Sequence, residues 1–296
     1  MRIGRSGRIL GVLCACGIAA APVLGGAAQM ADAAPLALAP TVPSIATTVA
    51  TVPTAASPST DTPDCYYGAC YDYVDGYQSV TSTGLSVVTT VKDPTLNHNY
   101  SDEHSLQEIS IQNSAQTSTV ELGWTVDAGV NGDYQPHLFV YHWVNGQVSC
   151  YNGCGYVAES GSGTYAAGGA LTPGTVVTLQ IQHGNSAWRL SVNGLEIGYF
   201  PDSLWSGSFT SGQLNSVFGE VAMDSADVPS CTQMGDGLFG TNPNASWFAD
   251  YQTFGGGAAP ALSVYATSSA YYDQGSVSST GFHLGGPGSN AACKTP

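Results

Sequence analysis

The chain has 296 residues, of which 9% are charged, and its 21 acidic residues outnumber 6 basic ones to give a formal net charge of −15. Nucleic acid and anionic membrane surfaces repel a chain this acidic, so its composition excludes both as partners. Because few cations offset the carboxylates, the composition suits an acidic medium, in which part of the carboxylates are protonated.

The N-terminal residues have the pattern of an export signal. Three arginines within the first eight residues precede an apolar run from Ile9 to Leu24, and Ala31-Asp32-Ala33 offers a small-x-small cleavage site. We expect residues 1–33 to be removed and the protein to be secreted, extracellular and free of the membrane. A membrane anchor is the alternative, although the apolar run contains glycines and a proline and has no stop-transfer flank.

Residues 34–63 consist mainly of Ala, Pro, Thr, Val and Ser, and their prolines interrupt any apolar periodicity. This composition predicts a flexible spacer or a removable pro-segment. We therefore place the folded domain at residues 64–296.

The remainder is a series of short apolar or alternating segments separated by turns rich in Gly, Asn and Pro, a pattern typical of antiparallel sheets. Turns are expected at 131–133, at Asn145-Gly146 and at Asn193-Gly194, and only residues 201–205 favour a helical turn. The predicted fold class is all-β, an antiparallel two-sheet β-sandwich with a concave substrate cleft. The predicted strands are 85–91, 105–112, 120–126, 138–144, 147–151, 176–182, 188–192, 195–200, 217–223 and 247–254.

Six cysteines lie outside the export signal. An even number in a secreted chain predicts disulfides, and the spacing lacks the repeated pairs of a zinc site, so we expect no metal and no cofactor. Proximity in the sequence favours two local pairs and leaves one long-range pair to hold the C-terminus. The expected disulfides are Cys65–Cys70, Cys150–Cys154 and Cys231–Cys293.

Two of the predicted strands carry a glutamate. Apolar and polar residues alternate through 119–126, with Glu121 on the polar face, and Glu220 interrupts the apolar run 217–223. A carboxylate in a strand is unfavourable without a partner or a function. Since the chain has only six glutamates, these two are candidates for one shared cleft.

The predicted strand 138–144 is apolar on both faces, with Phe139, Tyr141 and Trp143 on one and aliphatic residues on the other. In a sandwich the aliphatic face packs inward, so the aromatic face needs a cover of its own. Two interpretations remain open, packing under a long loop and an aromatic-lined binding groove beside Glu121.

A series of short motifs follows the chain in order: Glu121-Leu122-Gly123-Trp124, Cys150-Tyr151-Asn152, Gly219-Glu220-Val221, Thr232-Gln233-Met234-Gly235 and Gly285-Gly286-Pro287-Gly288. Over roughly residues 65–296, their order and spacing resemble those of the neprosin family of glutamic peptidases. The resemblance implies a β-sandwich, two catalytic glutamates that map onto Glu121 and Glu220, and cleavage after proline.

We therefore expect a secreted, acid-acting glutamic endopeptidase that works as a monomer on proline-containing peptides and proteins. Two neighbouring carboxyl groups share one proton in an acidic range. The ionised glutamate then takes a proton from the attacking water, and the protonated one polarises the peptide carbonyl. The sequence leaves open which of Glu121 and Glu220 is the base.

Other residues are candidates for binding the substrate. Phe139, Tyr141 and Trp143 offer flat apolar surfaces for a proline ring, and Gln233 is either an amide donor to the oxyanion or a side chain that stabilises a turn. Phe218 stands where the family motif has glycine and is expected to narrow the cleft beside Glu220.

Two other classes of protein remain as alternatives. A glycoside hydrolase uses a similar pair of carboxyl groups. In a non-catalytic glycan-binding or surface-binding sandwich, Glu121 and Glu220 are incidental. A serine peptidase is disfavoured because no Gly-x-Ser-x-Gly segment lies between strand and helix signals, and the six histidines are scattered, with His142 expected to be structural.

Overall fold

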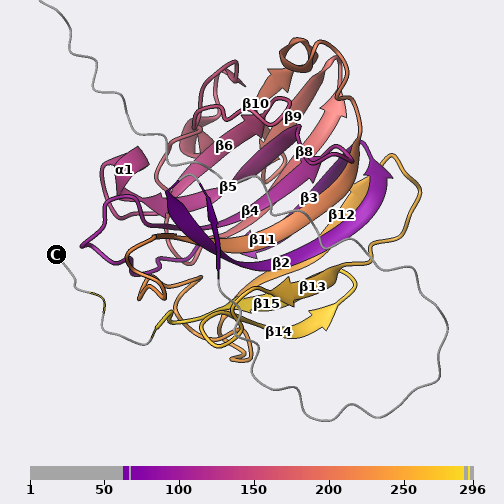
Figure 1. The fold of residues 1–296 in the computed structure, drawn as a ribbon. Coiled ribbons are helices and arrows are strands. Elements are labelled where there is room, and N and C mark those ends of the chain that lie inside the picture. Colours follow the sequence, from indigo (N-terminus) through magenta and orange to yellow (C-terminus); the bar gives the residue numbers. More distant parts are fainter. Residues whose placement is uncertain (1–62, 67, 290–292, 294–296) are drawn as a thin grey trace, which may run out of the picture.

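The computed structural model describes residues 63–66, 68–289 and 293 (Figure 1). The predicted export signal at 1–33, and all of the predicted spacer except Pro63, lie outside the described residues. Within the described part, no helix has the length and apolar character needed to cross a membrane.

The described chain forms a sandwich of two antiparallel sheets, which confirms the predicted fold class. The first sheet contains, in spatial order, β1 (Asp64–Tyr66), β2 (Ala69–Ser82), β11 (Gly212–Asp224), β4 (His104–Gln112), β5 (Thr119–Asp127) and β6 (His137–Trp143), with β13 (Ser263–Ala266) also paired to β2. The second contains β14 (Asp273–Ser278), β15 (Gly281–Gly285), β12 (Ser246–Phe254), β3 (Gly84–Thr90), β8 (Val176–Gly184), β9 (Ala187–Val192), β10 (Leu195–Pro201) and β7 (Val157–Ala158).

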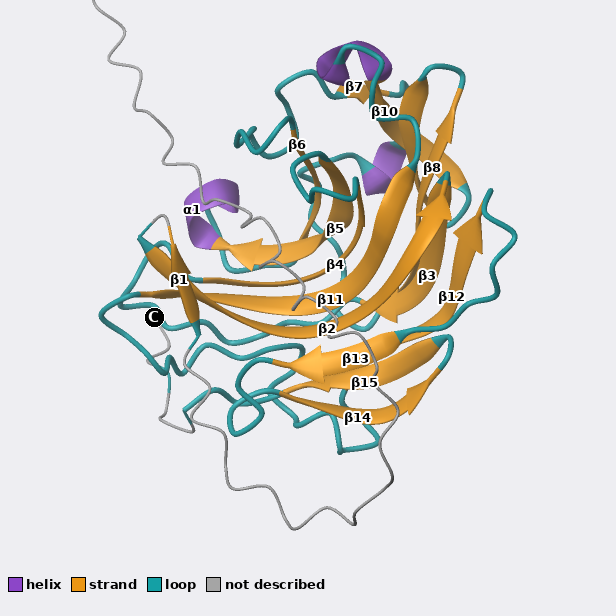
Figure 2. Cartoon of the chain, turned by 45° about the vertical axis from the view of Figure 1, so that its right-hand side comes forward, coloured by secondary structure: helices purple, strands orange, loops and turns teal. Residues whose placement is uncertain are grey.

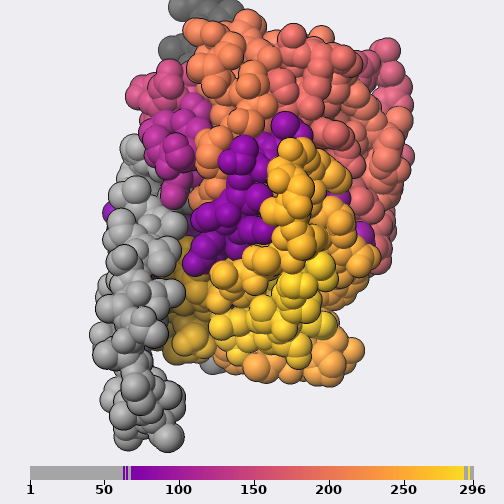
Figure 3. All heavy atoms as spheres, turned by 90° about the vertical axis from the view of Figure 1, so that its right-hand side faces the viewer, coloured from indigo at the N-terminus to yellow at the C-terminus, as the bar shows by residue number. Residues whose placement is uncertain are grey.

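The long strands of the first sheet are strongly curved, and their concave side is turned away from the second sheet (Figure 2). The helical elements are short: α1 (Ala128–Asn131) after β5, and two 3-10 turns, η1 (Gly163–Tyr165) and η2 (Asp202–Trp205). The C-terminal β13 runs beside the N-terminal β2, so the two ends of the domain share one side of the molecule (Figure 3).

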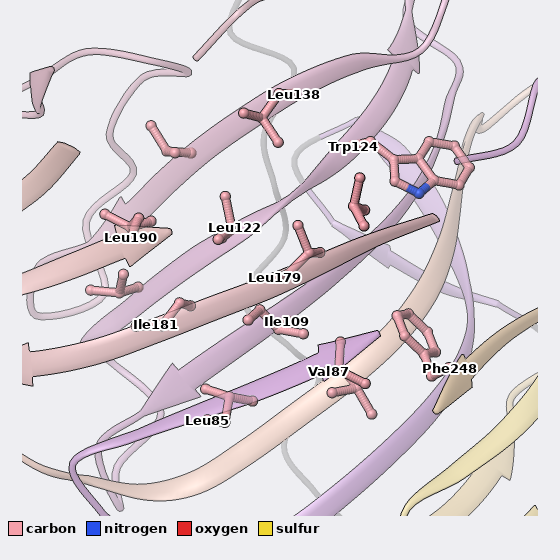
Figure 4. Close-up of a cluster of buried hydrophobic side chains, with 14 of the residues drawn as sticks. Leu85, Val87, Ile109, Leu122, Trp124, Leu138, Leu179, Ile181, Leu190 and Phe248 are labelled. Carbon is pink, nitrogen blue, oxygen red and sulfur yellow. The ribbon is translucent and has the colours of Figure 1, made fainter. Parts of the chain in front are cut away.

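The main core lies between the sheets because strands of both sheets point every second side chain into it. From the first sheet, Ile109, Leu122 and Trp124 point toward Leu179 and Phe248 of the second (Figure 4). All five are buried, and burying a side chain of this size is worth about 1.5–3 kcal/mol. Because the core takes up one face of β4 and β5, the side chains on their other face lie on the opposite side of the first sheet, away from the core.

One predicted strand is wrong. Asn145 and Gly146 form the expected tight turn with positive φ, but the ladder ends after the single bridge between Val144 and Gln147, and residues 147–151 form no strand. Cys150 pairs with Cys154 only four residues on, and Asn152 and Cys154 have positive φ, so the backbone of this short ring is not extended. The result is a loop of residues 144–156, which we call the β6–β7 loop.

The three expected disulfides are present. Cys65–Cys70 links β1 to β2, Cys150–Cys154 closes a ring in the β6–β7 loop, and Cys231–Cys293 joins segments 62 residues apart. In the chain-entropy model, closing a loop of about sixty residues stabilises the fold by roughly 4 kcal/mol.

Candidate active site

The strand register places Glu121 and Glu220 on the same face of the first sheet. Glu121 pairs with Ser110 of β4, and Glu220 pairs with Leu106 of the same strand. Paired residues point to the same side, and so do residues an even number apart. We call this side the site face; its side chains include Tyr71, Tyr73, Asp75, His104, Leu106, Glu108, Glu121, Asp127, Phe139, Tyr141, Trp143, Phe218 and Glu220.

Glu121 is buried, with only 4% of its surface exposed. Its Oε1 accepts a hydrogen bond from Nε1 of Trp143 (3.0 Å), whereas its Oε2 is buried without a partner. Burial raises the pKa of Glu121 well above its usual value, the charge of Glu220 raises it further, and the Trp143 hydrogen bond opposes both. Glu121 therefore tends to hold a proton.

Glu220 has a different partner. It is 2% exposed, and its Oε1 lies 2.9 Å from Nε2 of His104. The other ring nitrogen of His104, Nδ1, lies 3.7 Å from Oδ2 of Asp127. Burial alone lowers the pKa of His104, but the hydrogen bond and charge of Glu220, with the charges of Asp127 and Glu103, outweigh it and raise the pKa overall.

A third glutamate, which the sequence analysis missed, lies on the same face. Glu108 is 2% exposed and sits opposite Gly123 on one side and Phe218 on the other. A Cβ on Gly123 would lie 2.5 Å from the Cβ of Glu108, so glycine makes room for this carboxyl group. Burial raises the pKa of Glu108 well above its usual value, and Glu121, Glu220 and Asp75 add to that rise.

Asp75 of β2 lies opposite Phe218 in the register and is a further acidic group on the site face. Together, Glu121, Glu108, Glu220 and Asp75 form what we call the row of acidic groups. Burial raises the pKa of Asp75 to about 8, against a hydrogen bond from Tyr265. Phe218 is buried among these groups and meets Tyr73 edge-to-face at 6.0 Å. The phenyl ring thus occupies the same face as Glu220, as its position in the sequence predicts.

The aromatic residues of β6 are buried on the site face under the β6–β7 loop. Tyr151 of this loop contacts Phe139 and Tyr141, with ring centroids 5.5 and 5.1 Å apart, respectively. The Ser149 backbone N–H donates to the Tyr141 hydroxyl (3.0 Å). The aromatic face therefore packs under a long loop, which is the first of the two interpretations, and the aromatic-lined binding groove beside Glu121 stays a prediction.

Gln233 and His142 have other contacts. Gln233 Oε1 accepts a hydrogen bond from the Thr95 backbone N–H (3.0 Å), which is a bond that stabilises a loop. His142 points to the opposite side of β6 from Tyr141 and packs against Phe200, and burial lowers its pKa to about 4. In the part of the chain that the structure describes, no cluster of His, Cys, Asp and Glu has a geometry that would hold a metal ion.

Comparison with known proteins gives one family match. A family model described as Neprosin matches residues 101–287. Among solved structures, Scytalido-glutamic peptidase with a peptide-based transition-state analogue is 11% identical, at a TM-score of 0.41 over 72% of this chain and 96% of that one. SCP-B, a member of the eqolisin family of peptidases, is also 11% identical over the same shares of the two chains, at a TM-score of 0.34. A tetrameric galectin from Cinachyrella sp. is 16% identical, at a TM-score of 0.33 over 60% of this chain and 99% of that one.

Proposed function

The chain belongs to the neprosin family of glutamic peptidases, and we propose that it is an acid-acting endopeptidase in which Glu121 and Glu220 activate one water molecule. The observation that carries the proposal is the shared site face of these two buried carboxyl groups, together with the effect of the Glu220 charge on the Glu121 pKa. Two carboxyl groups that interact in this way divide one proton between them over a range of pH.

The chemistry needs one ionised and one protonated glutamate. The ionised one takes a proton from water while the water oxygen bonds to the peptide carbonyl carbon, and the protonated one donates to the carbonyl oxygen. When the C–N bond breaks, the leaving nitrogen takes up a proton from the pair. The net change is the addition of one water molecule, and no covalent intermediate is required.

The proposed substrates are peptides and proteins that contain proline, cut on the C-terminal side of that residue. The family resemblance suggests this preference. Phe139, Tyr141 and Trp143 are the aromatic groups proposed for it, and they are buried under the β6–β7 loop, so a proline ring would reach them only when that loop moves aside. A proline ring is flat and apolar, so it packs favourably on aromatic rings. Gln233 stays a candidate for the oxyanion contact only if its bond to Thr95 opens.

The proposed setting is extracellular, with the protein acting as a monomer. The three disulfides support this setting, because disulfides form and persist in oxidising compartments. The row of buried acidic groups supports work at acid pH, because the raised pKa values of Glu108 and Glu121 keep these groups protonated there.

The direct test compares Glu121→Gln and Glu220→Gln with wild type on a proline-containing peptide and on a β-glucan, from about pH 3 to 7. Glutamine keeps the shape of the side chain and removes its titrating proton, so each variant should lose at least about 10²-fold in kcat/KM. Glu196→Gln, which changes a strand glutamate of the second sheet, is the matched control. Peptide cleavage that survives in either site variant would refute the pair, and cleavage of the β-glucan alone would favour a glycoside hydrolase.

A further inference from the structure

We infer that His104, which lies between Glu220 and Asp127, is a positioning residue that keeps Glu220 ionised and oriented, so that Glu220 is the glutamate that accepts the proton of water. The inference rests on the proposed function, because it divides the roles within that pair. It starts from a contact that the sequence did not reveal, since His104 and Asp127 stand at the ends of two different strands.

The imidazole ring of His104 lies between two carboxylates on neighbouring strands. His104 of β4 pairs in register with Ala222 of β11 on one side and with Asp127 of β5 on the other. Its Nε2 lies 2.9 Å from Glu220 Oε1, and its Nδ1 lies 3.7 Å from Asp127 Oδ2. A neutral imidazole has one donor, whereas the imidazolium presents an N–H to each side. Two flanking carboxylates therefore favour the charged ring.

The surroundings of this ring are acidic and buried. The titratable groups around His104 or Glu220 are Glu121 and Asp127 of β5, Glu108 of β4, Glu103 just before β4, Tyr73 of β2 and Tyr151 of the β6–β7 loop. The described cationic side chains Lys92 and Arg189 pair with Asp236 and Glu196 instead. Among the residues that the structure describes, His104 is thus the group that supplies positive charge to the site face.

The two glutamates consequently have unlike partners. Glu220 meets a cation at hydrogen-bond distance, which favours its ionised form. Glu121 meets the neutral indole of Trp143 and has a buried oxygen without a partner, which favours its protonated form. These unlike partners make Glu121 the proton donor of the pair and Glu220 the proton acceptor. Water then loses its proton to Glu220, and Glu121 donates to the carbonyl oxygen.

The test is the pH dependence of kcat/KM for His104→Gln and Asp127→Asn on a proline-containing peptide. Removing the cation beside Glu220 should move the acid limb of the profile to higher pH by about one unit or more. Asp127→Asn should leave that limb in place or move it to lower pH, because it removes a negative charge from the surroundings of Glu220 while the ring keeps its charge at acid pH. Asparagine also keeps the bond by which Asp127 caps Val130 at α1.

His183→Gln is the matched control, since His183 Nε2 makes a contact of the same 2.9 Å length with Asp202 near the second sheet. The pH dependence of kcat/KM for His183→Gln should have its acid limb and its alkaline limb at the same pH as in wild type. Equal loss of activity at every pH in His104→Gln, or a shift of both site variants in the same direction, would overturn the inference. If Glu220→Gln stays active, the proposed function fails together with this inference. If Glu220→Gln is inactive and the acid limb of the His104→Gln profile does not move, only this inference fails.

A measurement on wild type covers the case in which His104→Gln does not fold. In protein labelled with ¹³C and ¹⁵N at histidine, the His104 ring should give imidazolium chemical shifts throughout the pH range of activity. A neutral ring at the pH of maximal kcat/KM would overturn the inference.

Discussion

Trp143 donates its indole N–H to Oε1 of Glu121 over 3.0 Å, and it does so from the neighbouring strand of the same sheet. The bond favours the ionised form of Glu121, whereas burial and the charge of Glu220 favour the protonated form and prevail. The indole therefore limits how far the pKa of Glu121 rises. It also fixes one carboxyl oxygen, whereas the other is buried without a hydrogen-bond partner.

We predict that Trp143→Phe lowers kcat/KM by about tenfold and moves the alkaline limb of the pH–rate profile to higher pH. A hydrogen bond to a charged group is worth about 1.5–3 kcal/mol, and its loss raises the pKa of Glu121 further. Trp188→Phe is the matched control, because Trp188 is equally buried and donates its N–H to the Phe209 carbonyl oxygen, in the core. It should lower the melting temperature without moving either limb. An alkaline limb that stays in place in Trp143→Phe would contradict the prediction.

Glu108→Gln should keep activity within about threefold of wild type at acid pH. Burial and three neighbouring carboxyl groups raise the pKa of Glu108, so it is protonated in the range where the pair works, and glutamine resembles a protonated carboxyl group. The measurement is kcat/KM beside that of Glu121→Gln, which should lose at least about 10²-fold. If Glu108→Gln is as inactive as Glu121→Gln, then Glu108 belongs to the catalytic machinery.

We predict that the free energy of unfolding falls as the pH rises from about 4 to 8. Burial raises the pKa of Asp75 to about 8 and that of Glu103 to about 7, in the latter case against hydroxyl bonds from Ser230 and Thr232. In this range the folded chain holds protons that the unfolded chain has lost, so the slope of stability with pH is negative. The lowered pKa of His142, about 4, acts in the opposite direction below the usual histidine value.

Thermal melting at a series of pH values tests this dependence. The melting temperature should be highest near pH 4–5 and several degrees lower at pH 8, since about 1 kcal/mol corresponds to 2–4 °C in a domain of this size. Asp75→Asn should flatten the curve between pH 5 and 8, because asparagine does not titrate. A melting temperature that rises throughout the range would show that the buried carboxyl groups are not protonated in the folded chain.

The period-two pattern located most strands because alternate side chains enter one core. It missed the short strands β1, β7, β13, β14 and β15. It also missed the long β2, which carries Asp72, Asp75 and Gly76 in its interior, residue types that are rare in strands. Their reasons are tertiary: Asp75 faces the acidic row of the site face, and a Cβ at Gly76 would lie 2.3 Å from the Phe282 ring. Local pattern carries no information on such contacts.

The candidate site could be predicted only in part, because the local pattern reveals residues within one strand but not their contacts with other strands. Glu121 and Glu220 are conspicuous because each is a carboxylate within a predicted strand whose other residues are uncharged. Glu108 meets the same criterion, but polar neighbours such as Gln107 and Ser110 conceal it. His104 and Asp127 become partners only through the register of β4 with β5, and register depends on how the whole sheet packs.

The last prediction concerns Phe218, whose ring lies between Asp75 and Glu108 in the register and beside Glu220 in the sequence. We expect Phe218→Ala to widen the set of residues accepted before the scissile bond, because a bulky ring limits the space over the site face. Residues larger than proline should gain about tenfold in kcat/KM relative to proline. The measurement is digestion of a peptide library with products identified by mass spectrometry, at equal folded concentration. Truncating a buried Phe costs about 3–5 kcal/mol, so the melting temperature must be recorded in parallel. An unchanged cleavage pattern in a folded variant would show that Phe218 does not limit specificity, and the preference would then have to come from the aromatic residues of β6.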